Sequence, residues 1–541
     1  MRFTTTCSFL ILTATLQAQN LTNPSWTLAA GGSADSRIKK IHVTDNGSVI
    51  ALGSFRRGEI TFDSYTLSEE PQLDNHFIIK TNSSGQTEWL KGGFNTTYDF
   101  ETDASGNIIV PSGDTLYMIS GNDGSLIWKT SLEPVNGSYL RIYQAELLTN
   151  GELVLAGEGY FEDIAAGSFY LDQATTGYYM FTAASDLNGN ISRITTYAFN
   201  NTPLLNEMQL ASNPDNGFYL AFRADEISND QLSAQAEVEN ALTTNPSRTA
   251  VAAFNEAGTA TWAITFKGDS ANVHVKEIHP EGSELYVSGN LYSAYGNLSP
   301  FSAGAASSSV SANCSGNNFQ AFSLVIDTVS KNIISQMDSE LGCQGNILGL
   351  GFRQYNNADY ALLQYQQDIT INSSLLLSQP DTSADQQYFY STALVKYNYN
   401  GQPVSATETG AKFGNSFGDL DIQPSGDVVT GGVYMDYQSL AGATPHAVLN
   451  KYVNSTTMIT ENLIMPRVNV YPNPSNGAFS LESDENILSV EIYSTDGSKI
   501  LANEGESNFM RFDLSAQPAG IYLVKTRTIH SVLKRLVVVE R

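Results

Sequence analysis

The stretch Asp45-Asn46-Gly47-Ser48-Val49-Ile50-Ala51-Leu52-Gly53 decides the fold of this chain. A polar turn, with Gly where a positive φ is easiest, leads into a strand of β-branched and small residues. About seven copies of this pattern occur, at spacings of about 45 to 75 residues. The other copies begin at Ala104, Asn150, Asn216, Gly282, Asn357 and Ser425. Such a period suits four-stranded antiparallel sheets joined by loops of variable length.

A second element alternates with the first: a strand that ends in a turn and leads to Trp. Its strong copies are residues 77–89, 116–128 and 251–262, and weaker copies cover 180–191, 322–334 and 393–404. In each strong copy a Gly precedes the Trp by four residues. We expect this Trp, or an aliphatic residue in its place, to pack between neighbouring sheets, because a single four-stranded sheet cannot bury both of its faces.

Together the two elements predict an all-β, seven-bladed β-propeller over residues 19–454, similar to exported bacterial propellers built from repeats of this kind. Ring closure usually needs strands from both ends of the domain, so we expect Trp26–Ala29 to pair with residues 446–452. Two stacked β-sandwiches are the rival architecture. Residues 116–128 also resemble a single repeat of pyrroloquinoline-quinone enzymes. The packing of propeller blades explains this one repeat without a cofactor. Small residues are expected on the crowded strand nearest the axis: Gly53, Ala156, Gly157, Gly289 and Gly431.

The C-terminal segment forms a separate pattern from Val468 onward. Tyr471-Pro472-Asn473-Pro474 predicts a rigid entry into a strand, because proline fixes φ and favours extended neighbours. Later landmarks are Gly477, an Asp-Gly hairpin turn at Gly497, the strand opening at Gly520 and Tyr522, and an apolar final strand with Lys534. These short strands and regular turns predict a small immunoglobulin-like β-sandwich over residues 468–541, with residues 455–467 as a linker.

The order of these landmarks resembles the type A C-terminal sorting domain of the Bacteroidetes type IX secretion system. The resemblance implies that the tail docks with the outer-membrane secretion machinery and is then removed by a sortase-like peptidase. The body would be secreted or attached to the outer cell surface. An ordinary immunoglobulin-like module without a sorting role is the alternative. The sorting-motif residues are Tyr471, Pro472, Asn473, Pro474, Gly477, Gly497, Gly520, Tyr522 and Lys534.

The N-terminus and the composition also indicate an exported protein. Residues 1–18 combine Arg2, an apolar run and Ala18, which predicts a secretory signal peptide rather than a transmembrane segment. With 55 acidic against 28 basic residues, the chain is unsuited to nucleic acid, whose phosphates need clustered Lys and Arg. After cleavage Cys314 and Cys343 remain, and they either form a disulfide, worth ~3–4 kcal/mol for a loop of this length, or stay as free thiols.

Motifs for catalysis and metal binding are sparse. The sequence has no His-Glu-x-x-His zinc pattern and no phosphate loop that ends in Gly-Lys-Ser/Thr. His42 alternates with apolar neighbours, so we expect an exposed or rim position. Asp45, Asp103, Asp123 and Asp427 lie beside turn glycines, where they could bind calcium, although hydrogen bonds to their own turns are a sufficient explanation. We therefore expect no cofactor.

For the function of the body we expect binding of a glycan or a protein by loops at one end of the ring, in a surface-display role. The alternative is an extracellular enzyme that acts on polysaccharide in the central funnel. Convergent His, Asp, Glu, Arg or Tyr side chains at the funnel would favour the enzyme, and a Gly, Ser and apolar lining would favour binding. A structural coat would show neither pocket nor polar cluster. Residues 231–242 are the best candidate for a short helix.

Overall fold

The computed structural model contains two compact units, and each described element is a β-strand. The first unit comprises Met1–Tyr397 with Gly401–Asn454, and the second comprises Ser455–Arg541 with Asn398–Asn400. The structure describes residues 24–70, 75–137, 139–199, 208–223, 237–239, 249–268, 272–292, 301–303, 309–310, 319–337, 347–355, 358–365, 369–371, 375–377, 390–398, 403–413, 418–435, 444–453, 468–494, 498–528 and 532–540.

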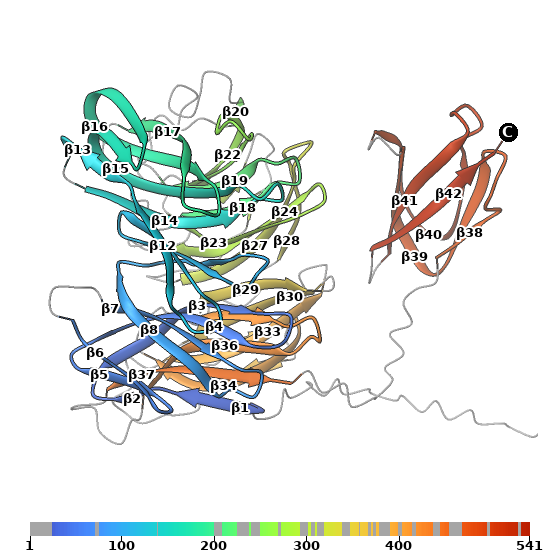
Figure 1. Cartoon of the computed structure of the whole chain (residues 1–541). Helices are drawn as coiled ribbons and strands as arrows, with labels where there is room; N and C mark the ends of the chain where they lie inside the picture. The colour runs from blue at the N-terminus through green and yellow to red at the C-terminus, as the bar shows by residue number, and fades with distance from the viewer. Residues whose placement is uncertain are drawn as a thin grey trace, which may run out of the picture. The chain divides into compact units, whose positions relative to one another are not determined.

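Among the described residues of the first unit, seven sheets each contain a run of four antiparallel strands, and two smaller sheets, β2-β5-β6 and β31-β32, are added to them. Figure 1 shows how these strands are arranged. We number the sheets in chain order and give the strands from the inside outward. Sheet 1 contains β3(Asp35–Val43), β4(Val49–Arg56), β7(Asn75–Thr81) and β8(Thr87–Asn95). Sheet 2 contains β9(Glu101–Thr102), β10(Ile108–Ser112), β11(Thr115–Ile119) and β12(Leu126–Ser131). Sheet 3 contains β14(Tyr139–Leu147), β15(Leu153–Ala166), β16(Phe169–Ser185) and β17(Ile191–Phe199).

Sheets 4 to 7 follow the same order, but sheet 7 ends on the N-terminal strand. Sheet 4 contains β18(Gln209–Ser212), β19(Phe218–Arg223), β21(Thr249–Phe254) and β22(Ala260–Gly268), and sheet 5 contains β23(Asn272–Glu281), β24(Glu284–Tyr292), β27(Phe319–Asp327) and β28(Ile333–Met337). Sheet 6 contains β29(Ile347–Tyr355), β30(Ala358–Tyr365), β33(Tyr390–Asn398) and β34(Pro403–Phe413). Sheet 7 contains β35(Asp419–Ile422), β36(Val428–Met435), β37(Pro445–Tyr452) and β1(Trp26–Ala29). Shorter additions are β2(Gly31–Gly32), β5(Glu59–Phe62), β6(Tyr65–Ser68), β13(Glu133–Val135), β20(Glu237–Glu239), β25(Phe301–Ala303), β26(Ser309–Val310), β31(Ile369–Ile371) and β32(Leu375–Leu377).

Sheet 7 joins the two ends of the first unit. β1 pairs with β37 in an antiparallel register that sets Trp26 opposite Lys451 and Ala29 opposite Val448. The pairing of these two segments expected from the sequence is thereby confirmed. Each sheet packs against the next in chain order, and β3 of sheet 1 contacts β35, β36 and β37 of sheet 7. The sheets thus form a circuit without a free end, as in β-propeller-like folds.

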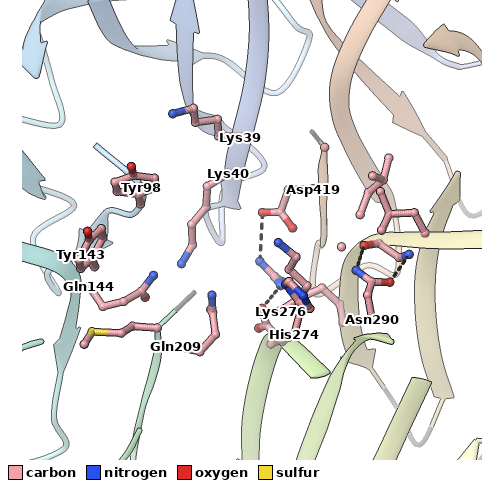
Figure 2. Close-up of a pocket in the computed structure, with 18 residues that line it drawn as sticks. Lys39, Lys40, Tyr98, Tyr143, Gln144, Gln209, His274, Lys276, Asn290 and Asp419 are labelled. Carbon is pink, nitrogen blue, oxygen red and sulfur yellow. Dashed lines mark hydrogen bonds and ion pairs between the residues drawn. The ribbon is translucent and has the colours of Figure 1, made fainter. Parts of the chain in front are cut away.

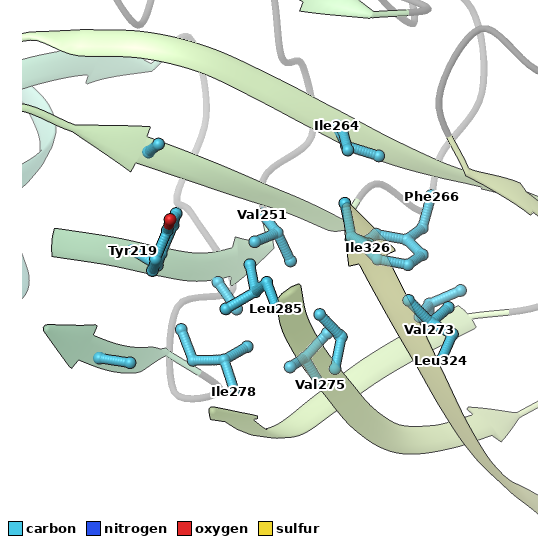
Figure 3. Packing of buried hydrophobic residues seen from close by; sticks show 14 of the residues in the cluster. Tyr219, Val251, Ile264, Phe266, Val273, Val275, Ile278, Leu285, Leu324 and Ile326 are labelled. Atoms are coloured by element: carbon cyan, nitrogen blue, oxygen red, sulfur yellow. The ribbon is translucent and has the colours of Figure 1, made fainter. Parts of the chain in front are cut away.

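The second strands of the sheets are buried over most of their length, as in β4, β10, β15, β19 and β30. In β4 the first seven of eight residues are buried, so both faces of the strand are covered. This pattern arises because each sheet is packed between two others, unlike a sheet with one solvated face. Figure 3 shows one such core, in which Tyr219 and Val251 of sheet 4 meet Val275 and Leu285 of sheet 5.

The repeated tryptophans lie between sheets, as the sequence predicts. Trp89 of sheet 1 is 5 % exposed and donates its indole N–H to the carbonyl of Gly121 in sheet 2, over 3.2 Å. A Cβ added at Gly124 would lie 2.9 Å from the Trp89 ring, so this turn must carry Gly. Trp128 is half-buried and makes the equivalent bond to Leu187 of sheet 3, over 2.9 Å. The spacing of Gly and Trp is therefore a docking device between consecutive sheets.

One predicted element is wrong. The segment from 231 to 242 was expected to contain a helix, but its described residues form the strand β20(Glu237–Glu239), which pairs in parallel with β22. Backbone hydrogen bonding to β22, the outermost of the four strands of sheet 4, here overrides a weak local helix preference.

The second unit has its own core, and its described residues form five strands. They are β38(Val468–Tyr471), β39(Ala478–Ser494), β40(Lys499–Asp513), β41(Gly520–Thr528) and β42(Val532–Val539). β39 pairs with β38, β40 and β41, and β42 pairs with β41. β39 is one long strand, whose pairing is interrupted by register shifts near Ile487. Phe479, Leu481, Val524 and Val537 belong to its core.

Candidate functional site

The innermost strands of the first unit surround a cavity of about 370 Å³, which we call the axial cavity (Figure 2). Residues of β3, β14, β18, β23, β24, β29 and β35 line it, so sheets 1, 3, 4, 5, 6 and 7 all contribute. In Figure 2, Tyr98, Tyr143 and Gln144 form one wall, and His274, Lys276 and Asn290 lie on the other side. The lining is mixed, and it contains many side chains that can hydrogen-bond.

A β-bulge at the same place in four innermost strands directs side chains into this cavity. The register of β3 with β4 passes from Ile38 to Lys40 and leaves Lys39 without an opposite residue. Bulges commonly re-aim a side chain beside a functional site. The four bulge residues, all of them in the cavity lining, are Lys39, Tyr143, Lys276 and Leu350.

Glycines of the second strands make room for three of these bulges. Gly53, Gly157 and Gly289 stand opposite the residue that precedes the bulge. A Cβ added to Gly157 would lie 2.1 Å from the carbonyl oxygen of Arg141, and one added to Gly289 would lie 2.0 Å from that of His274. The expectation that these glycines lie on the innermost strand is therefore wrong by one strand. They lie on its neighbour, where the bulged backbone approaches too closely for any side chain.

A cluster centred on Arg353 of β29 holds three sheets together, and we call it the arginine cluster. Arg353 Nη1 lies 2.9 Å from Glu277 of sheet 5, while Nη2 and Nε lie 3.4 Å from Asp419 and Asp421 of sheet 7. Asp419 also accepts the backbone N–H of Ile41 of sheet 1, over 2.9 Å. Burial raises the pKa of Asp419 to about 6 although Arg353 opposes this change. Burial likewise raises the pKa of Glu277.

Lys40 is the second paired cation at the axis. Its ammonium forms an ion pair with the buried carboxylate of Asp99. Burial by itself lowers the pKa of Lys40, but the charges of Asp99 and Glu277 outweigh burial and raise it. The charges of Lys40 and Arg353 are thus balanced by carboxylates, and these groups act first as ties between sheets.

Two glutamates near this ion pair have strongly altered acidity. Burial raises the pKa of Glu101 to about 7 and that of Glu146 to about 8, and the charge of Glu101 adds to the effect on Glu146. Glu146 accepts the backbone N–H of Ser212 over 2.9 Å, which joins sheet 3 to sheet 4. A carboxyl group that keeps its proton near neutral pH can act as an acid.

Tyrosines form the wall on the side of sheets 2 and 3. The rings of Tyr98 and Tyr143 lie 5.1 Å apart, and the ammonium of Lys39 lies 5.2 Å from the centre of the Tyr98 ring. The Tyr143 hydroxyl donates to Glu158 over 2.6 Å, so its direction is set. Burial and the charge of Glu158 raise the pKa of Tyr143, which therefore stays a hydroxyl.

Asn290 has a structural role in the cavity wall. Its side-chain amide donates to the carbonyl of Gly349 over 2.8 Å and accepts the N–H of the same residue over 2.7 Å. The side chain thereby satisfies the backbone of β29 where its bulge interrupts the pairing with β30. His274 and Lys276 of the adjacent strand remain on the cavity side.

The residues singled out from the sequence do not lie in this cavity. His42 is partly exposed at 3.6 Å from Asp421, as expected for a rim position, and burial lowers its pKa. Asp103 accepts the N–H groups of Ser105 and Asn107 in its own turn, over 2.8 and 2.7 Å, which is the simpler of the two explanations for such carboxylates. Among the described residues no group of three or more His, Cys, Asp or Glu could hold a metal ion.

The described sorting-motif residues lie on β38, in the segment that follows it, and on β41 and β42. Asn473 accepts the N–H of Val538 over 2.8 Å, and Ser475 forms a parallel bridge with Val539, so the Pro-Asn-Pro segment lies against β42. Tyr471, Pro472, Pro474 and Gly520 are exposed, Tyr522 is buried, and Lys534 pairs with Lys525 in β41. Gly477 has a φ of 109°, and an added Cβ would lie 2.6 Å from Ser515. Gly497, Cys314, Cys343 and residues 1–18 lie outside the described residues.

Sequence reasoning missed the cavity residues, although a signal for three of them exists. The Gly within the second strand, at Gly53, Gly157 or Gly289, marks a bulge in the preceding strand, and that bulge carries Lys39, Tyr143 or Lys276. A second pattern was also overlooked: residues 414–418 spell Gly-Asn-Ser-Phe-Gly. They precede the strand β35 and not a helix, so the context of a hydrolase nucleophile is lacking, and residues 414–417 lie outside the described part.

Comparison with known protein families identifies the tail. The family described as secretion system C-terminal sorting domain matches residues 469–540. The chain is a substrate of the type IX secretion system. It is accordingly secreted or attached to the outer cell surface. The tail interacts with the type IX secretion machinery, and no helix among the described residues has the length and apolar character needed to cross a membrane.

Solved structures that resemble the chain do so distantly. The quinohemoprotein alcohol dehydrogenase from Comamonas testosteroni is 9 % identical over 80 % of this chain and 77 % of its own, with a TM-score of 0.36. The WD40 domain of SCAP from fission yeast is 9 % identical over 94 % and 98 %, with a TM-score of 0.30. PorZ of Porphyromonas gingivalis, a surface component of the type IX secretion system, is 9 % identical over 95 % and 100 %, with a TM-score of 0.16. A search of curated proteins found no match.

Proposed function

We propose that the first unit is a seven-bladed β-propeller that binds a glycan in its axial cavity and is displayed or released at the cell surface. The observation that carries the proposal is the lining of the cavity, where tyrosines, amides and lysines of several sheets converge. Tyrosine is a suitable contact for sugars because its ring covers an apolar face and its hydroxyl can hydrogen-bond. A volume of about 370 Å³ suits one or a few sugar units better than a protein surface.

The ion pairs of the cavity favour binding over catalysis. Asp419 and Glu277 are both held by Arg353, and Asp99 is held by Lys40. Carboxylates that are neutralised in this way are poor candidates for the paired acid and nucleophile that glycoside hydrolysis requires. The lining is nevertheless more polar than the Gly, Ser and apolar surface we expected of a binding channel.

A glycan array tests the proposal with the full chain. We expect the wild-type chain to retain a defined set of glycans, and we expect Tyr98→Ala and Lys276→Ala to lose them. Lys91→Ala, an exposed lysine of β8 outside the cavity, is the matched control and should bind as the wild type does. No retained glycan, or equal binding by all four proteins, would contradict glycan binding in the cavity.

An extracellular enzyme acting on polysaccharide is the second candidate. It is favoured by the raised pKa values of Glu101 and Glu146, about 7 and about 8, which supply a protonated carboxyl near neutral pH. The test is the release of reducing ends from polysaccharides that the array identifies. Turnover by the wild type that Glu146→Gln abolishes would establish the enzyme, whereas binding without turnover would leave the binding role.

The processing of the chain follows from the sorting domain. We propose that residues 1–18 are removed as a signal peptide, that the propeller spans 19–454, and that a linker over 455–467 leads to a small immunoglobulin-like sandwich over 468–541. The observation that supports this division is the separation of the chain into two compact units at residue 454. A sortase-like peptidase would then remove the tail. Mass spectrometry of the exported protein tests both cleavages, and an intact C-terminus would contradict the second.

A further inference from the structure

Three tyrosines form a ladder across the long strands of sheet 3. Tyr139 of β14 stands opposite Tyr160 of β15, and Tyr160 stands opposite Tyr178 of β16. The rings of Tyr160 and Tyr178 lie 4.8 Å apart. Directly opposite residues of antiparallel strands share one face of a sheet, so the three rings form a row. All three are half-buried, which leaves part of each ring accessible.

The ladder lies at the base of a hairpin that is longer in sheet 3 than in sheet 1, where Asp35 and Arg56 take the places of Tyr139 and Tyr160. β15 and β16 contain 14 and 17 residues, whereas the equivalent strands β4 and β7 contain 8 and 7. The additional residues lengthen the hairpin, and among them Ile164 and Ala166 still belong to the core shared with sheet 2. The opposite face of the same segment carries Phe161 and Tyr179, which are buried in the core with sheet 2. The two faces therefore differ, and the ladder is not needed to fill that core.

A continuous series of contacts joins the ladder to the axial cavity. The guanidinium of Arg141 lies 5.6 Å from the centre of the Tyr139 ring. Arg141 stands opposite Glu158, and Glu158 accepts the hydroxyl of Tyr143, which lines the cavity beside Tyr98. Tyr139 and Tyr143 are four positions apart in β14, which corresponds to about 13 Å of strand. Aromatic rings and a cation thus line a track from the cavity to the extended hairpin.

The charge of the cavity contrasts with that of the chain. The whole sequence carries 55 acidic and 28 basic residues. The charged residues of the cavity lining are the four cations Lys39, Lys40, Lys276 and Arg353 and the two anions Glu277 and Asp419. Arg141 adds a further cation on the track. Lys40 and Arg353 are compensated by Asp99, Glu277, Asp419 and Asp421. The attraction for an anion along this path therefore comes from Lys276 in the cavity and from Arg141, which stands opposite Glu158.

We propose that this track binds an acidic polysaccharide chain, with one end in the axial cavity and the following sugar units on the tyrosine ladder. This inference rests on the proposed glycan binding and extends it to the ligand's charge and length. The ladder supplies ring faces for the apolar sides of successive sugars, while Arg141 and Lys276 attract carboxylate groups. A single sugar unit occupies only the axial cavity, whereas a longer chain also contacts Tyr160 and Tyr178.

Calorimetric titration of the full chain with oligogalacturonates of increasing length tests the track. We expect the monosaccharide to bind weakly, and we expect affinity to rise with length until the ladder is covered. Tyr160→Ala and Tyr178→Ala should each weaken binding of the long chains about tenfold and leave the monosaccharide unaffected. Cello-oligosaccharides of the same lengths are the neutral match and should bind at least tenfold more weakly.

The matched control is Tyr170→Ala, because Tyr170 lies on the same hairpin but is 56 % exposed and stands outside the ladder. It should bind every length as the wild type does. Affinity that is independent of length in the wild type, which needs no variant to fold, would overturn the track. Equal binding of neutral and acidic chains would overturn its charge selectivity. Either of these two results leaves glycan binding in the axial cavity standing if the glycan array shows binding. An array without binding overturns both glycan binding in the cavity and the track.

Discussion

Replacing Arg353 by methionine should destabilise the first unit, because one side chain compensates three carboxylates. Arg353→Met keeps most of the length of the side chain and removes its charge. Glu277, Asp419 and Asp421 would then face one another across sheets 5 and 7 without a cation between them. The side chain of Arg353 is 17 % exposed and that of Asp419 is 10 % exposed, so water replaces the lost partner poorly.

The expected loss is ~3–5 kcal/mol, the usual cost of removing one partner from a buried ion pair. For a unit of this size that loss corresponds to a decrease of ~3–6 °C in the melting temperature. The loss should depend on pH. Without Arg353 the pKa values of Asp419 and Glu277 rise further, so acid protonates these carboxyls and relieves their repulsion. The destabilisation is therefore larger near pH ~8 than near pH ~5.

Differential scanning calorimetry of the full chain at both pH values measures this effect. Arg56→Met is the matched control, because Arg56 is 57 % exposed in its ion pair with Asp35 and should contribute less than ~1 kcal/mol. Adding Asp419→Asn to Arg353→Met should recover part of the loss. The reasoning is refuted if Arg353→Met melts within a degree or so of Arg56→Met at pH ~8, or if its loss grows as the solution is acidified.

Three further changes probe other parts of the fold. The melting temperature of Glu146→Gln should depend less on pH than that of the wild type. Folding raises the pKa values of Glu146 and Glu101, so the wild type is most stable below the pKa of an unfolded glutamate and loses stability as the pH rises to about 8. Parallel curves of melting temperature against pH for the two proteins would be the contrary result. Gly431→Val should cost ~1–3 kcal/mol in urea unfolding, because a Cβ there would lie 2.6 Å from side-chain atoms of sheet 1; an unchanged midpoint would show that sheets 7 and 1 are less tightly packed. Trp89→Ala should cost ~3–5 kcal/mol, whereas Ile127→Ala, 51 % exposed, should change stability by less than ~0.5 kcal/mol, and similar losses for both would argue against a role of Trp89 between sheets.

Much of the fold could be predicted because its signals are local. Gly47 and Gly106 have the positive φ of a turn, and a strand follows each of them. The pairing of β1 with β37 could also be predicted, since a circuit of sheets needs both ends of the chain. The assignment of Gly53, Gly157 and Gly289 to the wrong strand has a physical reason. A sequence shows that a residue must be small, but it does not show which neighbour approaches it.

The candidate site could not be predicted in the same way. Lys40, Glu277, Arg353 and Asp419 are far apart along the chain and meet only because their strands converge on one axis. None of them belongs to a motif, and the charge of each looks like that of an ordinary surface residue. Their burial, and the pKa values that follow from it, depend on side chains contributed by other sheets.

By itself the sequence determined the periodic strands and turns, the tryptophans that dock one sheet on the next, and the sorting tail. These features depend on residues close together in the chain, whose backbone preferences and alternation act locally. Only the tertiary structure decided which side chains enter the axial cavity, which charges compensate one another, and where the tyrosine ladder lies. Those arrangements depend on the register between strands and on bulges in it, because a shift of one residue turns a side chain from the core to the axis.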